Sequence, residues 1–189
     1  EETFNSITVD NDMSTNDTVL LLSSSMAGNT PLSVSSQGLK KFQKALFEVM
    51  DSLARMIVKD GEGATKTMEV IVKGARTKPE ARRAARAVAG SLLVKTAIYG
   101  ADPNWGRIMA ALGASGIRVK PDAVAIKING VKVVNSGVGT GREEEARMKM
   151  QKSGHIVIEI KLKEGDAQGR ALGCDLTEDY VKLNAHYTT

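Results

Sequence analysis

A short turn, DGEGATK at residues 60–66, places one carboxylate, Glu62, between two glycines. The turn lies where an amphipathic pattern ends and a β-branched run begins, so it joins a predicted helix to a predicted strand. Glycine allows close backbone approach, and a carboxylate in such a turn could be held out to meet a ligand. The glycine spacing fits neither a phosphate loop nor a dinucleotide fingerprint. Solvated charges beside a helix-ending glycine explain the same residues equally well.

Two further polar stretches could bind a ligand, but the structural interpretation is favoured for each. In GADPNWGR, residues 100–107, Asp102 is expected to cap the next helix, with Pro103 at its first position. In STNDTVLLL, residues 14–22, polar side chains precede an apolar run and could face a ligand or bond their own backbone in a turn. These polar side chains are Thr15, Asn16, Asp17 and Thr18.

The end of the chain, NAHYTT, offers another group of polar side chains, namely Asn184, His186 and Thr189. A C-terminal tail is usually frayed, so a tail with a function must be tied down. His155 and His186 are the only histidines and lie far apart in the sequence, and Cys174 is the single cysteine. We therefore expect no zinc site, no internal disulfide and no catalytic triad built within this chain.

Charge and composition narrow the classes of partner. The 189 residues carry a net charge of +4, and charged residues make up 25%, which is ordinary for a globular protein. The cluster Arg82, Arg83 and Arg86 lacks interleaved aromatic residues, so it predicts a solvated helix face rather than a nucleic-acid surface. The apolar runs are far shorter than a bilayer span, and EETFN does not resemble a signal peptide. We expect a cytoplasmic protein without nucleic-acid or membrane partners.

The first half of the sequence predicts mainly helices. A short β-prone stretch at residues 5–12 follows what reads as the end of a helix already under way. The run TVLLLSSS, residues 18–25, has the length of a buried strand. An amphipathic helix is predicted over residues 38–59 and a strand over residues 65–75. Pro79 opens another helix, whose inner face is expected to comprise Ala81, Ala84 or Ala85, Val88, Leu92 and Thr96.

The second half predicts more strands. AVAIKI and VKVVNSG flank Asn129 and Gly130, which suit the two positive-φ positions of a tight hairpin turn. A charged helix at residues 142–151 precedes strands at residues 155–162 and 169–177, and a polar tail follows.

The change in pattern between the halves predicts a boundary near residues 101–116, followed by a short helix. We divide the chain into residues 1–104 and residues 105–189. The fold class is mixed α/β or α+β, with mixed sheets.

Four stretches of the sequence resemble the ornithine acetyltransferase family, also known as the glutamate N-acetyltransferases of arginine biosynthesis. They are FNSITVDNDMSTNDTVLLL, DGEGATK, KTAIYGADPNWGRIMAALG and GCDLTEDYVKLNAHYTT. They occur in the family's order and reach from the first residues to the last. The resemblance implies a layered α/β fold of the kind found in self-cleaving aminopeptidases, with a smaller C-terminal α+β subdomain.

The resemblance also implies how such a protein is made. Family members cut themselves before a threonine, giving an α chain and a β chain, and that threonine becomes the nucleophile. This chain looks like the β chain without its N-terminal threonine segment, because it begins at Glu1. The catalytic nucleophile is therefore expected upstream of Glu1, with the oxyanion-hole residues on the α chain, in an α2β2 heterotetramer.

Three residues match the family's substrate-binding positions, namely Glu62, Asn184 and Thr189. Glu62 is expected as a partly buried carboxylate that pairs with the substrate's amine. The implied reaction moves acetyl from N-acetylornithine to glutamate through an acetyl-threonine, with no metal or redox cofactor. Acetyl-CoA stays open as a second donor.

Other functions remain alternatives to this one. A related N-terminal-nucleophile amidase or aminopeptidase would use water as the acceptor, and a secondary-metabolite acetyltransferase would use another acceptor. A non-catalytic module that binds an anionic partner is the third alternative, because of the net charge of +4.

Overall fold

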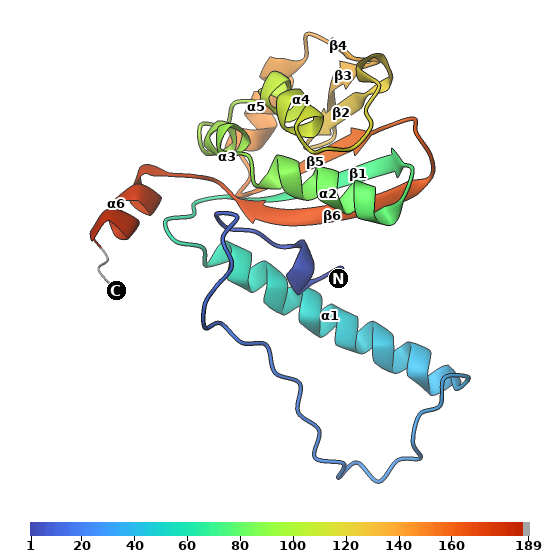
Figure 1. Ribbon diagram of the computed structural model, residues 1–189. Helices are drawn as coiled ribbons and strands as arrows, with labels where there is room; N and C mark the ends of the chain where they lie inside the picture. Colours follow the sequence, from blue (N-terminus) through green and yellow to red (C-terminus); the bar gives the residue numbers. More distant parts are fainter. Residues whose placement is uncertain (187–189) are drawn as a thin grey trace.

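A six-stranded mixed sheet forms the centre of the computed structural model, which describes residues 1–186 (Figure 1). The strands are β1 (Thr67–Ala75), β2 (Ala125–Ile128), β3 (Val131–Asn135), β4 (Val138–Gly139), β5 (His155–Lys161) and β6 (Ala167–Cys174). Their order across the sheet is β4-β3-β2-β5-β1-β6. β1 runs parallel to β5 and antiparallel to β6, and the remaining pairs are antiparallel.

Six α-helices accompany this sheet in the described part of the chain. They are α1 (Gln37–Lys59), α2 (Lys78–Ala89), α3 (Leu92–Tyr99), α4 (Trp105–Gly113), α5 (Glu143–Gln151) and α6 (Glu178–His186). Two 3-10 turns, η1 (Phe4–Ser6) and η2 (Pro121–Ala123), complete the regular structure. α2 packs on β1 and β6 beside α4, whereas α1 contacts β6 and η1 and its N-terminal end projects away from the sheet (Figure 1).

The core lies between the sheet and the helices α2, α3, α4 and α5. Side chains alternate along β1, so Met68, Val70 and Val72 are buried on one face of the strand. They belong to one cluster with the small residues of α2, Ala81, Ala84, Ala85 and Val88. A Cβ on Gly169 in β6 would lie 2.6 Å from the backbone nitrogen of Arg82 in α2. Small residues therefore let α2 approach the sheet closely.

The predicted helix after Pro79 is two helices, with a break at Gly90. The carbonyl of Gly90 accepts a hydrogen bond from the side-chain amide of Asn11, at 2.8 Å. The hydroxyl of Ser91 then caps α3 by accepting from the Val94 nitrogen. The break turns Leu92 outward, so Leu92 is 61% exposed and Thr96 is exposed too. Their predicted place on the inner face was wrong.

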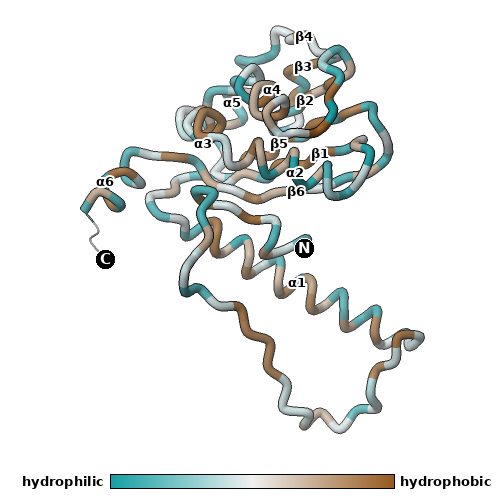
Figure 2. Tube along the Cα trace, in the orientation of Figure 1, coloured by the Kyte–Doolittle hydropathy of each residue, from teal (hydrophilic) through white to brown (hydrophobic). Residues whose placement is uncertain are grey.

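The predicted strand at residues 18–25 was also wrong. Residues 12–35 contain neither helix nor strand, and Val19 to Leu22 are between 60% and 86% exposed. This apolar run stands out in the extended loop of Figure 2. A strand requires hydrogen-bonding partners for its backbone, and no other strand of the described chain lies against this run. The stretch at residues 5–12 likewise makes a single bridge, from Ile7 to Leu172.

The predicted hairpin and the predicted amphipathic helix, α1, are confirmed, whereas the cap of α4 and the polar tail need correction. Asn129 and Gly130 have φ angles of 45° and 79°, as the predicted hairpin requires. α4 is capped by Asn104 rather than by Asp102, because the Asn104 side chain accepts from the Arg107 nitrogen at 3.2 Å. Part of the predicted polar tail is the helix α6.

The division at residue 104 stays a prediction. The sheet takes β1 from before this position and its other strands from after it. Within residues 1–186, no helix combines the length and the apolar character needed to cross a membrane.

Candidate functional site

The Glu62 turn begins where α1 ends. Asp60 closes the last turn of α1, and the nitrogen of Ala64 donates to the carbonyl of Gly61 at 2.9 Å. This bond makes residues 61–64 a β-turn, with Glu62 second and Gly63 third. Gly63 has a φ of +65°, which the third position of a type II turn requires. The turn therefore presents Glu62 at its corner, where the side chain is exposed rather than partly buried as predicted.

Gly63 is also the point where the C-terminal helix docks. Its carbonyl accepts a hydrogen bond from the Thr177 hydroxyl at 2.7 Å. A Cβ on Gly63 would lie 2.5 Å from the backbone nitrogen of Tyr180. A larger residue would thus strain the turn and push α6 away from it.

The fold brings Glu62 and Asn184 together, although 122 positions separate them. The Asn184 amide nitrogen donates to Glu62 Oε2 at 2.6 Å and to the Tyr180 carbonyl at 3.0 Å. Both partners are pure acceptors, so only the nitrogen of the amide can lie between them. Two of the three predicted site residues therefore touch, and Thr189 lies outside the described residues.

The surroundings of this pair are acidic. Asp10 and Asp12 lie near the Tyr180 hydroxyl together with Glu62, and the hydroxyl donates to Asp10 Oδ2 at 3.0 Å. Burial, the hydrogen bond to Asp10 and the neighbouring carboxylates raise the pKa of Tyr180 to about 12. Within residues 1–186, none of the three carboxylates forms an ion pair. The site thus suits a cationic group.

Asp175 fixes the exit of the turn against the end of β6. This buried carboxylate accepts from the Thr65 nitrogen at 2.9 Å, from the Thr65 hydroxyl at 2.5 Å and from the Lys66 nitrogen at 3.1 Å. The Lys66 ammonium donates to the carbonyls of Ile98 and Tyr99. It thereby satisfies the last carbonyls of α3.

A buried lysine, Lys95, links the segment before Asp10 to the end of β6. The Lys95 ammonium is 1% exposed and donates to the carbonyls of Val9 and Cys174 at 2.5 Å and 2.6 Å. Burial raises the pKa of the Cys174 thiol, against the opposing effect of Lys95 at 3.5 Å. Lys95 therefore joins the segment that carries Asp10 to the strand that leads into Asp175.

Sequence reasoning missed Asp10, Tyr180, Asp175 and Lys95. One signal for Lys95 was available, because it is the single charge in the apolar stretch LLVKTAIY. Such a charge inside an apolar helix indicates a buried partner.

The other predicted residues lie elsewhere. Residues 15–18 are exposed in a local turn, where the Ser14 hydroxyl accepts from the nitrogens of Asn16 and Asp17. His155 bonds the Thr67 hydroxyl through Nδ1, far along the chain from His186 in α6. Across residues 1–186, no three His, Cys, Asp or Glu side chains are grouped as a metal would require.

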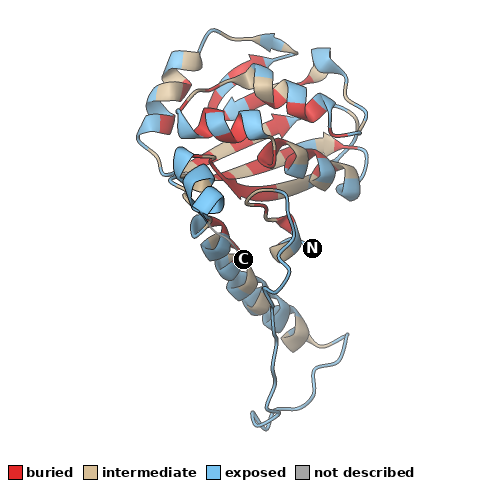
Figure 3. Cartoon of the chain, turned by 60° about the vertical axis from the view of Figure 1, so that its left-hand side comes forward, coloured by how far each residue is buried: buried red, intermediate tan, exposed pale blue. Residues whose placement is uncertain are grey.

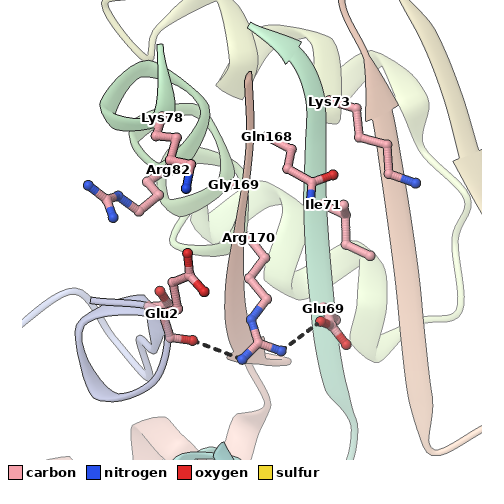
Figure 4. Close-up of a pocket in the computed structure, with 10 residues that line it drawn as sticks. Glu2, Glu69, Ile71, Lys73, Lys78, Arg82, Gln168, Gly169 and Arg170 are labelled. Atoms are coloured by element: carbon pink, nitrogen blue, oxygen red, sulfur yellow. Dashed lines mark hydrogen bonds and ion pairs between the residues drawn. The ribbon is translucent and has the colours of Figure 1, made fainter. Parts of the chain in front are cut away.

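A hollow lies around Arg170, on the face of the sheet opposite to α2 (Figure 4). The Arg170 guanidinium donates to Glu69, to Asp51 and to the Glu2 carbonyl. Arg55 also bonds both Asp51 and Glu69, at 2.9 Å and 3.1 Å. These charges already pair with one another. We therefore interpret them as a structural ion-pair network rather than as the lining of a ligand site.

Comparisons with known proteins place this geometry in a family. The sequence matches the ArgJ family over residues 1–189. The arginine biosynthesis bifunctional protein ArgJ of Thermus thermophilus is 51% identical over 100% of this chain and 48% of its own length. The glutamate N-acetyltransferase of Methanocaldococcus jannaschii is 45% identical, with the same two coverages. The chain thus spans about half the length of these curated relatives.

A solved structure shares the fold. The crystal structure of the arginine biosynthesis bifunctional protein ArgJ from Bacillus halodurans superposes with a TM-score of 0.95 at 46% identity. The match covers 98% of this chain and 88% of that chain. The predicted α/β fold class is confirmed.

Proposed function

Because the chain belongs to the ArgJ family, we propose that it is the β chain of a glutamate N-acetyltransferase in arginine biosynthesis. The observation that carries the proposal is the contact between Glu62 and Asn184. The family resemblance singles out both residues for substrate binding, and the fold brings them within 2.6 Å. Thr189 is the proposed third ligand.

Glu62 and Asn184 would bind the cationic side-chain amine of N-acetylornithine. Glu62 uses Oε2 for Asn184, so Glu62 Oε1 and Asn184 Oδ1 make no hydrogen bond within residues 1–186. A primary ammonium has three N–H donors, and a charge-assisted bond to a carboxylate is stronger than a neutral one. The carboxylates of Asp10 and Asp12 add to the negative potential around that position.

The chemistry would belong to a threonine upstream of Glu1. Its hydroxyl would attack the acetyl carbonyl, the carbon–nitrogen bond would break, and ornithine would leave with the transferred proton. The amine of glutamate would then attack the acetyl ester and regenerate the threonine, so the kinetics would be ping-pong. The threonine's own α-amine would act as general base, and oxyanion donors on the α chain would stabilise the intermediates. The scheme includes no metal or redox cofactor, and acetyl-CoA is a candidate second donor.

An α chain from the same precursor would cover the apolar surface of this chain, in an α2β2 assembly. Val19 to Leu22 are exposed, and so are Phe42, Val49 and Met56 on α1, as Figure 3 shows for the helix as a whole. Large exposed apolar patches mark interfaces. The lengths of the matched proteins also support a precursor that is divided in two. This chain covers 88% of the chain in the crystal structure but 48% of the curated relative, so the crystal chain is about half as long as that relative. An intact-mass spectrum of the purified full-length product should show two polypeptides in equal amount, and a single uncut polypeptide would contradict this part of the proposal.

Substitution of Glu62 tests the site. In the assembled enzyme, Glu62→Gln keeps the size of the side chain but removes the charge. We expect kcat/KM for N-acetylornithine to fall roughly 100-fold, about 3 kcal/mol, as for a lost hydrogen bond to a charged group. Glu178→Gln, which changes an exposed carboxylate of α6, is the matched control and should leave kcat/KM unchanged.

Two outcomes would count against the proposal. Near-normal kinetics of Glu62→Gln would remove the role of Glu62. Hydrolysis of N-acetylornithine by the unmodified enzyme, without acetyl transfer to glutamate, would favour the amidase alternative, and transfer to a different acceptor would favour the secondary-metabolite enzyme.

A further inference from the structure

We propose that Tyr180 and Asp10 form a latch that holds α6 in place and so positions Asn184 against Glu62. This inference rests on the proposed function for its effect on substrate, but the latch itself has a separate structural readout. Tyr180 and Asp10 act here as positioning residues, because they work through Asn184.

Apolar packing contributes little to the docking of α6. No residue of α6 is buried, and its larger apolar side chains, Val181 and Leu183, are exposed. Figure 3 shows the helix as an exposed element beside the upper end of α1. Polar bonds therefore have to fix its position.

Three such bonds come from one face of the C-terminal segment. Thr177, Tyr180 and Asn184 are spaced i, i+3 and i+7, so they share a face in helical geometry. They bond the Gly63 carbonyl, the Asp10 carboxylate and the Glu62 carboxylate, at 2.7 Å, 3.0 Å and 2.6 Å. The middle bond ties α6 to a different segment from the other two, which both reach the Glu62 turn.

Asp10 is a firmly held partner for this middle bond. Its Oδ2 accepts from Tyr180, and its Oδ1 accepts from the Asp12 nitrogen at 3.0 Å. The carbonyl of the preceding residue, Val9, accepts a hydrogen bond from the buried Lys95 ammonium. Asn11, on the other side, bonds the Gly90 carbonyl at the α2 end. The carboxylate is thus anchored through the body of the protein.

Tyr180 is also linked directly to the site residue. Its own carbonyl accepts the second amide hydrogen of Asn184, at 3.0 Å. A shift of Tyr180 therefore moves one of the two acceptors that orient the Asn184 amide. Loss of the latch should weaken substrate binding without touching the reacting atoms.

The decisive variant is Tyr180→Phe in the assembled, self-processed enzyme, because it removes the hydroxyl and keeps the ring. We expect KM for N-acetylornithine to rise about 10-fold with kcat within about twofold, as for one lost hydrogen bond to a charged group. We also expect faster tryptic cleavage after Lys182 of α6, because its side chain is already exposed and only the docked helical backbone protects the peptide bond from trypsin. Tyr99→Phe removes a tyrosine hydroxyl outside the latch and is the matched control.

Asp10→Asn is the conservative partner variant, since an amide oxygen can still accept from the Tyr180 hydroxyl. In Asp10→Asn, tryptic cleavage after Lys182 should stay nearly as slow as in the unmodified enzyme. In Asp10→Ala, cleavage should be as fast as in Tyr180→Phe. The double variant Tyr180→Phe/Asp10→Ala should be no worse than either single variant, because both remove the same bond.

Each result decides one way. A higher KM together with faster cleavage of α6 supports the latch. Unchanged cleavage in Tyr180→Phe overturns it, whatever happens to KM, because Tyr180 would then act on substrate directly or not at all. Faster cleavage with an unchanged KM overturns the link between α6 and binding. Failure of the proposed function would show instead as absence of acetyl transfer in the unmodified enzyme, and the cleavage assay would still report on the latch.

Discussion

Strand β1 and the run from Val19 to Leu22 are both rich in aliphatic residues, yet they have opposite environments. Met68, Val70 and Val72 of β1 are fully buried, whereas the four residues of the run are mostly exposed. β1 has β5 on one edge and β6 on the other, and the run has no strand beside it in the described chain. Aliphatic composition creates the tendency to form a strand, but the neighbouring strands provide the hydrogen bonds.

The comparison can be tested by substitutions, and the largest loss of unfolding free energy is expected from Ile158→Ala in β5. Ile158 is fully buried and lies between Val70 of β1 and Ile128 of β2. Truncation leaves a cavity in the core, so the free energy of unfolding should fall by about 3–4 kcal/mol. Urea denaturation measures this change, and a loss below about 1 kcal/mol would mean that the sheet is not the core of the protein.

A somewhat smaller effect is expected from Lys95→Met, which removes the buried ammonium but keeps the length of the side chain. The Val9 and Cys174 carbonyls would lose their donor. Buried acceptors without a partner cost roughly 1–3 kcal/mol, so we expect a loss of about 2–3 kcal/mol in the same assay. Lys44→Met, at an exposed position of α1, is the control and should change stability little. An unaltered stability of Lys95→Met would show that the N-terminal segment does not depend on this bond.

The free energy of unfolding is expected to depend on pH through the ion pairs of Asp51 with Arg55 and Arg170. Burial alone would raise the pKa of Asp51, but hydrogen bonds from Arg55 and Arg170 lower it below its ordinary value of 3.8. Stability from these bonds is therefore fully present above pH 3.8 and is lost as the pH falls below it. Denaturation curves from pH 5 to pH 2 should show a steeper loss in the unmodified protein than in Asp51→Asn. Equal slopes would refute the assignment.

The smallest effect on this chain is expected from Leu21→Ser. Leu21 is exposed, so the substitution should change the unfolding free energy of the chain alone by less than about 0.5 kcal/mol. Its effect should appear in assembly, because the apolar run is the surface proposed to meet the α chain. Co-purification of tagged α chain with the variant should be reduced, and normal recovery would place the interface elsewhere.

Local chemistry explains which elements were predictable. The Asn129–Gly130 hairpin depends on two adjacent residue types, and α1 depends on a periodic pattern within one segment. The break at Gly90 has a local signal that was missed, the Ser91 cap of α3, and a distant contribution from the Asn11 side chain, 79 positions away. α6 was missed because its pattern is weak and its docking bonds come from Asp10 and the Glu62 turn.

The sequence by itself determined the turn that presents Glu62, because a glycine at the third turn position permits the required positive φ. It also carried the family resemblance that pointed to Asn184. Only the tertiary structure decided that these two side chains touch, and that Asp10, Lys95 and Tyr180 support them. The physical reason is range: φ preferences and hydrophobic periodicity act over a few residues, whereas the site is assembled by hydrogen bonds between segments more than 75 positions apart.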